Sequence, residues 1–328
     1  MRPATRRRFI TISAAAAGLT LLSPRARLTE TPLMHVWRGT ALGADAMLLL
    51  HHPDPAAAEA LIQDSLAEVA RLERQLSLYD PQSALVQLNR EGVLDDPPLD
   101  LLRVMNESAR YHALTGGAFD VTVQPLWDLY AAHFERPDAD PAGPPASAVA
   151  ATLTRIGQHR VSLAAERIDF VPDTAVTLNG IGQGYITDRV VALLRARGIA
   201  HALVDMGETR AIGGHPDGGP WRVGLDDPFA PGHVAEQIPL ADRAVATSGG
   251  YGTLFDTAGR FNHIFDPSDG STSHTFAAVS VIAPEATMAD ALSTAFSVMT
   301  LPRITEIVRL LGIEAHLALP DGSRAVVV

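Results

Sequence analysis

Short apolar runs separated by turns constrain the fold of this chain more than any other feature. From about residue 160 onward, three such runs cover 160–163, 167–171 and 175–178, and each has the length and residue types of a strand. Further strands are expected at 44–51, 201–205, 221–225 and 278–282. Because the strands follow one another in hairpins, with helices inserted rather than strictly alternating, the pattern predicts an α+β fold with largely antiparallel sheets flanked by helices.

Helices are expected in three segments of the chain. Apolar residues spaced three and four apart predict helices over 55–76 and 99–115, and a further helix is expected over 184–197. The segment 135–145 is too dense in proline for regular structure. We interpret it as a surface loop inserted within one domain rather than as a domain boundary. A single domain is therefore expected over residues 30–328.

The residue composition excludes several kinds of chemistry. The chain has no Cys, which rules out disulfides, thiolate nucleophiles, iron–sulfur clusters and Cys-based zinc sites. Its 26 basic residues are all Arg. The absence of Lys rules out a Schiff base and the Lys of a nucleotide-binding P-loop.

Residues 1–29 are predicted to be a targeting segment rather than part of the fold. Thr5-Arg-Arg-Arg-Phe-Ile10 matches the twin-arginine export pattern, and the apolar run 10–22 has 13 residues, too few to span a bilayer comfortably. The alternative is a basic N-terminus followed by a hydrophobic anchor. We favour a twin-arginine signal, which predicts a periplasmic protein.

The chain that follows the signal segment is expected to be strongly acidic. The signal holds six Arg and no acidic residue, which leaves 20 basic and 37 acidic residues and a net charge of −17. This charge argues against nucleic acid or an anionic membrane surface as a partner. No later segment is long and apolar enough for a transmembrane span, so none is expected in the mature chain.

The segment 286–296 is the first candidate for functional chemistry. It has the pattern of a helix that carries Asp290 and Thr294 at positions i and i+4, which places both side chains on one face. A hard divalent cation binds such oxygen pairs, completed by backbone carbonyls, water or substrate phosphate. The alternative is that Asp290 only caps the helix or interacts with its dipole.

Two further segments contain residue types suited to binding and proton transfer. The run 180–184 offers bare backbone amides before a helix, although without a Rossmann unit it is weak support for a dinucleotide site. His263 can change protonation near neutral pH, and Asp266 could orient its ring. A purely structural His is the alternative. Phe119 and Ile264 read equally well as core residues or as walls of a ligand site.

Four segments taken together resemble a known family. They are 117–126, 178–188, 261–267 and 286–296, and their order and spacing are similar to those of the ApbE family. Members of that family move FMN from FAD onto a threonine or serine of a target protein. The resemblance extends from about residue 36 to about residue 300 and implies an α+β fold.

The resemblance also implies roles for individual residues. It makes His263 the base and Asp266 its partner, and it places Mg2+ on the backbone carbonyl of Gly182 together with Asp290 and Thr294. The residues implied to contact FAD are Tyr79, Ala118, Phe119, Asp120, Tyr185 and Ile264. The chain departs from the family at two places. Gly182-Gln183 stands where Ala-Lys is usual, and Arg38 stands where Met is usual in Met-Gly-Thr.

The function implied by the resemblance is the Mg2+-dependent transfer of FMN from FAD, with release of AMP. The acceptor would be a Thr or Ser hydroxyl of a flavin-acceptor protein, membrane-bound or periplasmic, that transfers electrons. The export signal and the variant segment 203–208 are similar to the branch linked to nitrous oxide reductase maturation. The alternatives are a periplasmic FAD-binding protein, an FAD pyrophosphatase that uses water, and a flavin oxidoreductase, which no Rossmann fingerprint supports.

Overall fold

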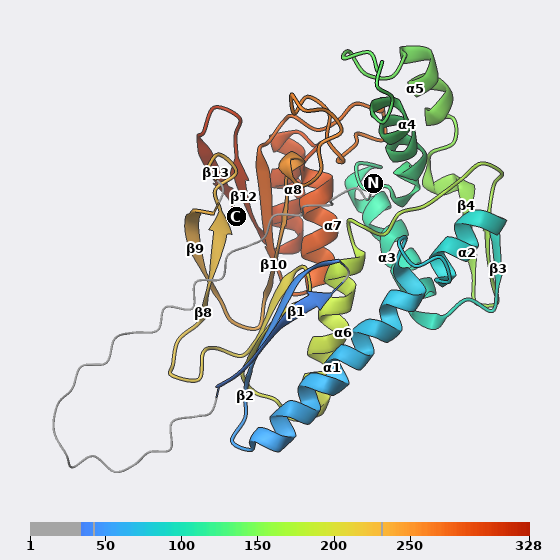
Figure 1. The fold of residues 1–328 in the computed structure, drawn as a ribbon. Coiled ribbons are helices and arrows are strands. Elements are labelled where there is room, and N and C mark those ends of the chain that lie inside the picture. The colour runs from blue at the N-terminus through green and yellow to red at the C-terminus, as the bar shows by residue number, and fades with distance from the viewer. Residues whose placement is uncertain (1–33, 42, 231) are drawn as a thin grey trace, which may run out of the picture.

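The central feature of the fold is an eight-stranded antiparallel sheet (Figure 1). The computed structural model describes residues 34–41, 43–230 and 232–328, so the predicted signal segment 1–29 lies outside the described residues. The strands lie in the order β1-β2-β6-β7-β10-β11-β12-β13. Their bounds are Met34–Ala41, Ala44–His51, Ala202–Asp205, Thr209–Ile212, Ala244–Ser248, Ala278–Ala283, Glu314–Ala318 and Arg324–Val327.

Two smaller sheets complete the β-structure. One has the order β3-β5-β4, and the other is the hairpin β8-β9. Their strands are β3 Val93–Asp95, β4 Val161–Ala164, β5 Arg167–Phe170, β8 Trp221–Asp226 and β9 Val234–Leu240. Every strand pairing is antiparallel, which confirms the predicted fold class.

The helices flank the sheets and account for most of the remaining regular structure. They are α1 Pro55–Leu76, α2 Ala84–Glu91, α3 Leu99–Thr115, α4 Gln124–Phe134, α5 Ala146–Leu153, α6 Gly182–Ala196, α7 Ala286–Phe296 and α8 Leu301–Leu311. Short 3-10 turns lie at η1 Val121–Val123, η2 Gln158–Arg160 and η3 Gly250–Gly252. None of the helices in the described part of the chain has the length and apolar character needed to cross a bilayer.

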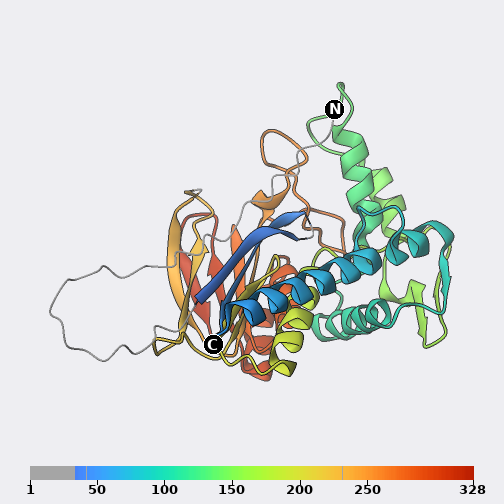
Figure 2. The same cartoon turned by 60° about the horizontal axis from the view of Figure 1, so that its bottom comes forward.

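Both faces of the central sheet are buried, and strand β2 shows how. Its side chains alternate in direction, so Leu48 and Leu50 pack into the core beneath the helices. Met47 and Leu49 point the other way and pack against the β8-β9 hairpin. Figure 1 shows this hairpin and helices α6 and α7 on opposite sides of the sheet. In the turned view of Figure 2, α1 lies between β1-β2 and α3.

Local signals place the helix ends where the sequence predicted them. Asp54 accepts hydrogen bonds from the amides of Ala56 and Ala57 and Pro55 opens the first turn, so α1 begins at residue 55. Helix α3 ends at Gly116, whose φ of 67° is in the left-handed region. The predictions for 55–76 and 99–115 are confirmed. Segment 135–145 joins α4 to α5 without regular structure, also as predicted.

The strand predicted at 175–178 is wrong. This segment has no regular secondary structure, and the side chain of Asn89 bonds both polar groups of the Val176 backbone, at 2.8 Å each. The amide of Thr177 donates to the carbonyl of Val121. Because these backbone groups are already paired, the segment joins no ladder. Helix α6 also begins two residues before the expected start, at Gly182.

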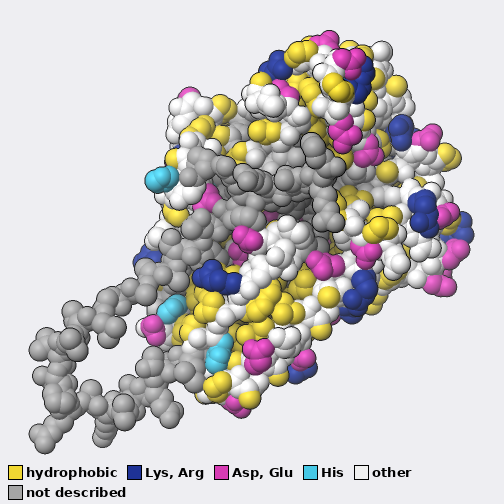
Figure 3. All heavy atoms as spheres, in the orientation of Figure 1, with side chains coloured by type: hydrophobic (Ala, Val, Ile, Leu, Met, Phe, Trp, Pro, Cys, Tyr) yellow, Lys and Arg dark blue, Asp and Glu magenta, His cyan; other side chains and the backbone are white. Residues whose placement is uncertain are grey.

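Charged side chains of both signs are mixed over the surface. On the face shown in Figure 3, Arg side chains lie among Asp and Glu side chains rather than in one basic patch. Many of them are paired locally, as in Arg110–Glu107 at 2.6 Å and Arg167–Asp169 at 2.8 Å. Exposed pairs of this kind contribute little to the stability of the fold, because water and salt screen them.

Candidate functional site

A large cavity lies beside the central sheet, where segments distant in the sequence meet. Its volume is about 1310 Å3, above the range of roughly 300–1,000 Å3 typical of small-molecule sites. Strands β1, β2, β6 and β10 and helix α7 contribute to its walls, together with loops near residues 118–127, 177–183 and 249–267. It is therefore large enough for an extended ligand such as a dinucleotide.

Most of the predicted site residues line this cavity. They are Tyr79, Ala118, Phe119, Asp120, His263, Ile264, Asp290 and Thr294. Arg38 and the segment 247–249 also line it. Three predicted residues do not: Gly182, Tyr185 and Asp266.

The Asp290 and Thr294 oxygens lie on the same face of α7, as predicted. Asp290 is buried, with 3% of its surface exposed, and its Oδ2 accepts a hydrogen bond from the amide of Gly184 at 3.0 Å. Thr294 Oγ1 lies 3.2 Å from Ser248 Oγ, at the end of β10. A side chain at Gly180 would bring its Cβ to 2.9 Å from Thr294 Oγ1. The bare backbone of Gly180 thus leaves room beside this pair of oxygens.

The ring of His263 is held by backbone atoms. Its Nδ1 lies 3.3 Å from the backbone nitrogen and 3.2 Å from the carbonyl oxygen of Thr253. Asp266 was expected to orient this ring, but the structure gives Asp266 a turn role. Its Oδ1 accepts hydrogen bonds from the amide and hydroxyl of Ser268, at 2.8 and 2.6 Å. Backbone atoms of Thr253, which sequence reasoning missed, contact the His263 ring.

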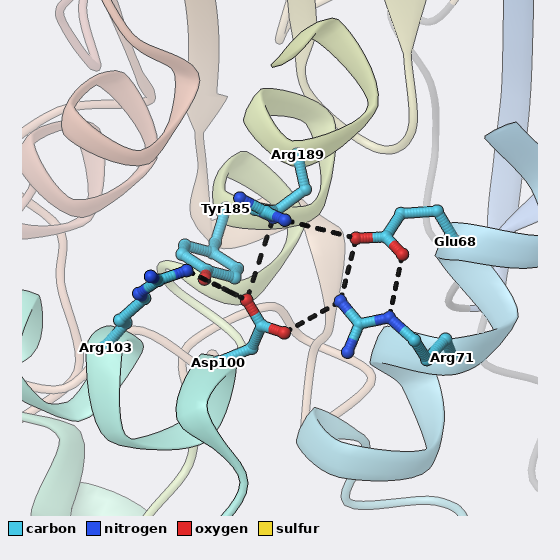
Figure 4. A network of polar contacts seen from close by, with 6 residues as sticks. All are labelled: Glu68, Arg71, Asp100, Arg103, Tyr185 and Arg189. Carbon is cyan, nitrogen blue, oxygen red and sulfur yellow. Dashed lines mark hydrogen bonds and ion pairs between the residues drawn. The ribbon is translucent and has the colours of Figure 1, made fainter. Parts of the chain in front are cut away.

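Tyr185 does not line the cavity and belongs to the polar network of Figure 4. Its hydroxyl donates to Asp100 Oδ1 at 2.6 Å, and Arg71 donates to the other oxygen at 2.7 Å. Burial alone would raise the pKa of Asp100, but these bonds hold it below its usual value. Arg71 also pairs with Glu68. The network ties α6 to α1 and α3, so Tyr185 stabilises the helix layer.

Gly182, whose backbone carbonyl the family resemblance connects with the metal, lies at the start of α6. Its neighbours Gly180 and Gln183 line the cavity while Gly182 does not. The Gln183 side chain packs closely against Gly207, where a Cβ would lie 2.4 Å from Nε2. The position usually held by Lys in the family is therefore occupied by an amide that packs against the 206–208 turn.

Asp120 serves the local structure as well as the cavity wall. Its Oδ1 accepts hydrogen bonds from the amide and hydroxyl of Thr122, at 2.8 and 2.5 Å, which caps the short turn η1. Its Oδ2 lies 3.3 Å from His112 Nδ1. This carboxylate raises the pKa of His112. The turn it caps holds Ala118 and Phe119 against the cavity.

The cavity is strongly acidic, which no sequence pattern revealed. Six carboxylates line it, and Arg38 is the one guanidinium among the described lining residues. The carboxylates are Asp45, Asp120, Asp205, Glu208, Asp226 and Asp290. The four that sequence reasoning missed come from β2, β6, the β6-β7 turn and β8. An anionic ligand in this cavity therefore needs a cation beside it.

Asp205 should make the folded state less stable as the pH rises from about 4 to about 6. Burial, with a smaller contribution from the charge of Asp45, raises its pKa to about 6, above the value of about 3.9 expected in the unfolded chain. The folded state therefore binds the extra proton between these values, and stability falls as pH rises through that window. We expect Asp205→Asn to increase the free energy of unfolding at pH 7.5 by at most about 3 kcal/mol.

The same gain should shrink to about half at pH 5, since the folded Asp205 is then protonated. Urea unfolding at both pH values measures the difference. A pH-independent gain would show that Asp205 is not the titrating group.

Comparison with known proteins decides the family. The model of the ApbE family matches residues 40–317. The chain belongs to the ApbE family. An FAD:protein FMN transferase from Klebsiella pneumoniae (strain 342) is 30% identical over 298 residues, covering 87% of this chain and 82% of that protein. The enzyme of the same name from Salmonella typhimurium is 30% identical over 320 residues, covering 94% and 88%.

Solved ApbE structures share the fold. The apo form of the Pseudomonas stutzeri flavinyl transferase ApbE superposes with a TM-score of 0.76 at 26% identity, covering 90% of this chain and 96% of that one. The ApbE protein of Thermotoga maritima gives a TM-score of 0.80 at 26% identity, covering 90% and 97%. The antiparallel sheet with its flanking helices is thus the ApbE fold.

Proposed function

We propose that this ApbE-family chain transfers FMN from FAD to a Thr or Ser hydroxyl of an acceptor protein and releases AMP, with Mg2+ required. One observation carries the proposal. The cavity brings the segment 118–120 and Tyr79 together with His263 and the Asp290–Thr294 pair. These are the residues that the family resemblance connects with FAD, proton transfer and the metal. The relatives reported above bear the name of this activity.

The residues present suit Mg2+ rather than a transition metal. Among residues 34–328 as described, no three His, Asp or Glu side chains are arranged to hold a metal ion. The site instead offers the Asp290 carboxylate and the Thr294 hydroxyl, on a face where Gly180 leaves space. Mg2+ binds through one or two carboxylates and keeps water or substrate phosphate for its other positions. A bound Mg2+ would offset the charge of the FAD diphosphate inside the acidic cavity.

The chain's own residues would bind the flavin and move the proton. Tyr79, Phe119 and Ile264 supply apolar walls for the rings, and His263 accepts the proton of the acceptor hydroxyl. The hydroxyl oxygen forms a bond to the phosphorus of the FMN half. The bond from that phosphorus to the bridging oxygen breaks, and AMP leaves with the bridging oxygen and its electron pair. No covalent bond to this chain is formed.

A direct assay tests the proposal. The chain 30–328 is incubated with FAD, Mg2+ and a flavin-acceptor domain, and the denatured products are inspected for flavin fluorescence on a gel. We expect a fluorescent acceptor band that EDTA abolishes. If an established FMN transferase labels the same acceptor and this chain leaves it dark, the proposed activity is refuted.

A second candidate function rests on Gln183, whose side chain packs against Gly207. Gln183 stands where the family usually has Lys, so the cavity has one less cation for phosphate, which favours slow transfer of FMN. An FAD-binding protein or an FAD pyrophosphatase would fit this arrangement. Measuring AMP in the absence of acceptor separates the two, because only the pyrophosphatase releases it. Gln183→Lys should speed transfer if the missing cation limits the rate.

His263 is expected to act on the rate of transfer rather than on FAD binding. Removing a general base usually costs about 10²–10⁴-fold, so we expect His263→Gln to lower the turnover by roughly 10²-fold or more. FAD affinity, measured by quenching of flavin fluorescence, should stay within a few-fold. A loss of affinity equal to the loss of rate would instead make His263 a binding residue.

The proposal includes the location of the chain and the kind of acceptor protein. The twin-arginine motif at 5–10 supports delivery to the periplasm, where the acceptor would be an electron-transfer protein of the membrane or the periplasm. The exported branch linked to nitrous oxide reductase maturation is the narrower assignment. Cell fractionation tests the location, with a variant in which Arg6 and Arg7 are both Lys as the control. Export that persists in this variant would contradict the twin-arginine route.

A further inference from the structure

Asp188 lies at a junction of three elements and does not line the cavity. Its carboxylate accepts hydrogen bonds from the first two amides of α7, from Ala286 to Oδ1 and from Thr287 to Oδ2, both at 2.9 Å. The Thr287 hydroxyl donates to Oδ2 at 2.6 Å. Arg210 on β7 donates to Oδ1 at 2.5 Å. Every oxygen of Asp188 is therefore engaged, and both side chains of the ion pair are largely buried.

These bonds replace an ordinary helix cap. The first amides of a helix have no partner within it and are usually capped by the preceding residue. Glu285 holds that position in α7, but its side chain makes no cap hydrogen bond. Asp188 on α6 caps α7 from outside, and its charge interacts favourably with the positive end of the helix dipole. The start of α7 is thus fixed by a residue of α6 rather than by the residue that precedes α7 in the sequence.

A second contact joins α6 and α7 one helical turn away from Asp188. Gly184 lies four residues before Asp188 on α6, and its amide donates to Asp290, four residues after Ala286 on α7. A Cβ at Gly184 would lie 2.3 Å from the carbonyl oxygen of Ala286, so the two backbones are almost in contact. The contacts made by residues 184 and 188 of α6, four residues apart, therefore hold α7 in one register against α6.

We propose that Asp188 is a positioning residue that sets this register and thereby the affinity of the Asp290–Thr294 pair for a divalent cation. The proposal rests on the proposed function for the identity of the cation. Asp188 does not line the cavity and reaches the Asp290–Thr294 pair through its bonds to the start of α7. Partners that orient metal ligands typically change metal affinity by about 10–100-fold when they are removed.

The test compares Asp188→Asn with Asp100→Asn. Each variant replaces a largely buried carboxylate that is paired with an Arg. Asp188 lies on α6 and bonds to α7, whereas Asp100 lies on α3 and bonds to Arg71 of α1 and Tyr185 of α6. Binding of Mn2+ in the presence of FAD is followed by electron paramagnetic resonance, and the Mg2+ dependence of FMN transfer is measured separately. Circular dichroism and thermal melting report whether each variant is folded.

We expect Asp188→Asn to weaken Mn2+ binding by about 10–100-fold. The Mg2+ concentration for half-maximal transfer should rise by the same factor, with turnover at saturating Mg2+ within a few-fold of the parent. Asp100→Asn should lose stability without a change in cation affinity. Equal weakening in both variants, or unchanged Mn2+ binding in a folded Asp188→Asn, would overturn the proposal.

Thr287→Val keeps the proposal testable if Asp188→Asn does not fold. This substitution removes one hydroxyl donor to Asp188 and leaves both amide bonds in place. We expect a several-fold weakening of Mn2+ binding, and no weakening would count against the inference. Failure of the proposed function is distinguishable, since the parent chain would then bind Mn2+ with FAD but transfer no FMN. A parent chain that binds no cation would overturn the inference itself.

Discussion

Asp290→Asn is expected to lower FMN transfer on the order of 10³-fold, because it removes the carboxylate charge through which the cation would bind. The amide keeps the size of the side chain and can still accept the hydrogen bond from Gly184, so the crossing of α6 and α7 should persist. Transfer is measured as denaturation-resistant flavin on the acceptor over a range of Mg2+ concentrations. The residual activity should no longer respond to Mg2+.

The matched control for this substitution lies on the same helix. Glu285→Gln also converts a carboxylate to an amide, but Glu285 is exposed at the start of α7 and makes no cap hydrogen bond. Its activity and Mg2+ dependence should equal those of the parent chain. Thr294→Ser, which keeps the hydroxyl, should retain far more activity than Thr294→Val. If Asp290→Asn keeps the full Mg2+ dependence of the parent chain, the cation must bind through other residues.

Gly184→Ala is expected to cause the largest loss of stability among single substitutions near the site. The added Cβ would lie 2.3 Å from the carbonyl oxygen of Ala286 and 2.9 Å from the Cβ of Asp290. Overpacking of a buried contact costs typically 1–3 kcal/mol, and a backbone atom cannot move aside as a flexible side chain can. We therefore expect a loss of about 3 kcal/mol or more in the free energy of unfolding, measured by urea titration.

Gly182→Ala, two residues away, is expected to cause no loss of stability. The nearest atom to a Cβ there is Leu178 Cβ at 3.6 Å, an ordinary contact, and the backbone is helical. Ala is a better helix residue than Gly by roughly 0.8–1.0 kcal/mol in a helix interior, so stability should be unchanged or slightly increased. The backbone carbonyl assigned to the metal by family resemblance is retained. A large loss at 182 with none at 184 would contradict this arrangement of α6 and α7.

Local sequence determined the elements whose signals lie within a few residues of one another. Helices 55–76 and 99–115 were predictable because their signals act locally: apolar spacing in both, the Asp54 cap at the start of the first, and Gly116 at the end of the second. Asp290 and Thr294 share a face for the same reason, since they are one helical turn apart. The order of the four family segments was likewise readable from the chain, and it identified the ApbE family.

Tertiary structure decided what depends on residues distant in the chain. Residues 175–178 have strand-like composition, yet the side chain of Asn89, 87 positions away, bonds both backbone polar groups of Val176. The acidity of the cavity arises because separate strands bring Asp45, Asp205 and Asp226 to its lining. Asp188 caps a helix that begins 98 residues later. Hydrogen bonds and charges act through space, so only the packing of sheet and helices could reveal these partners.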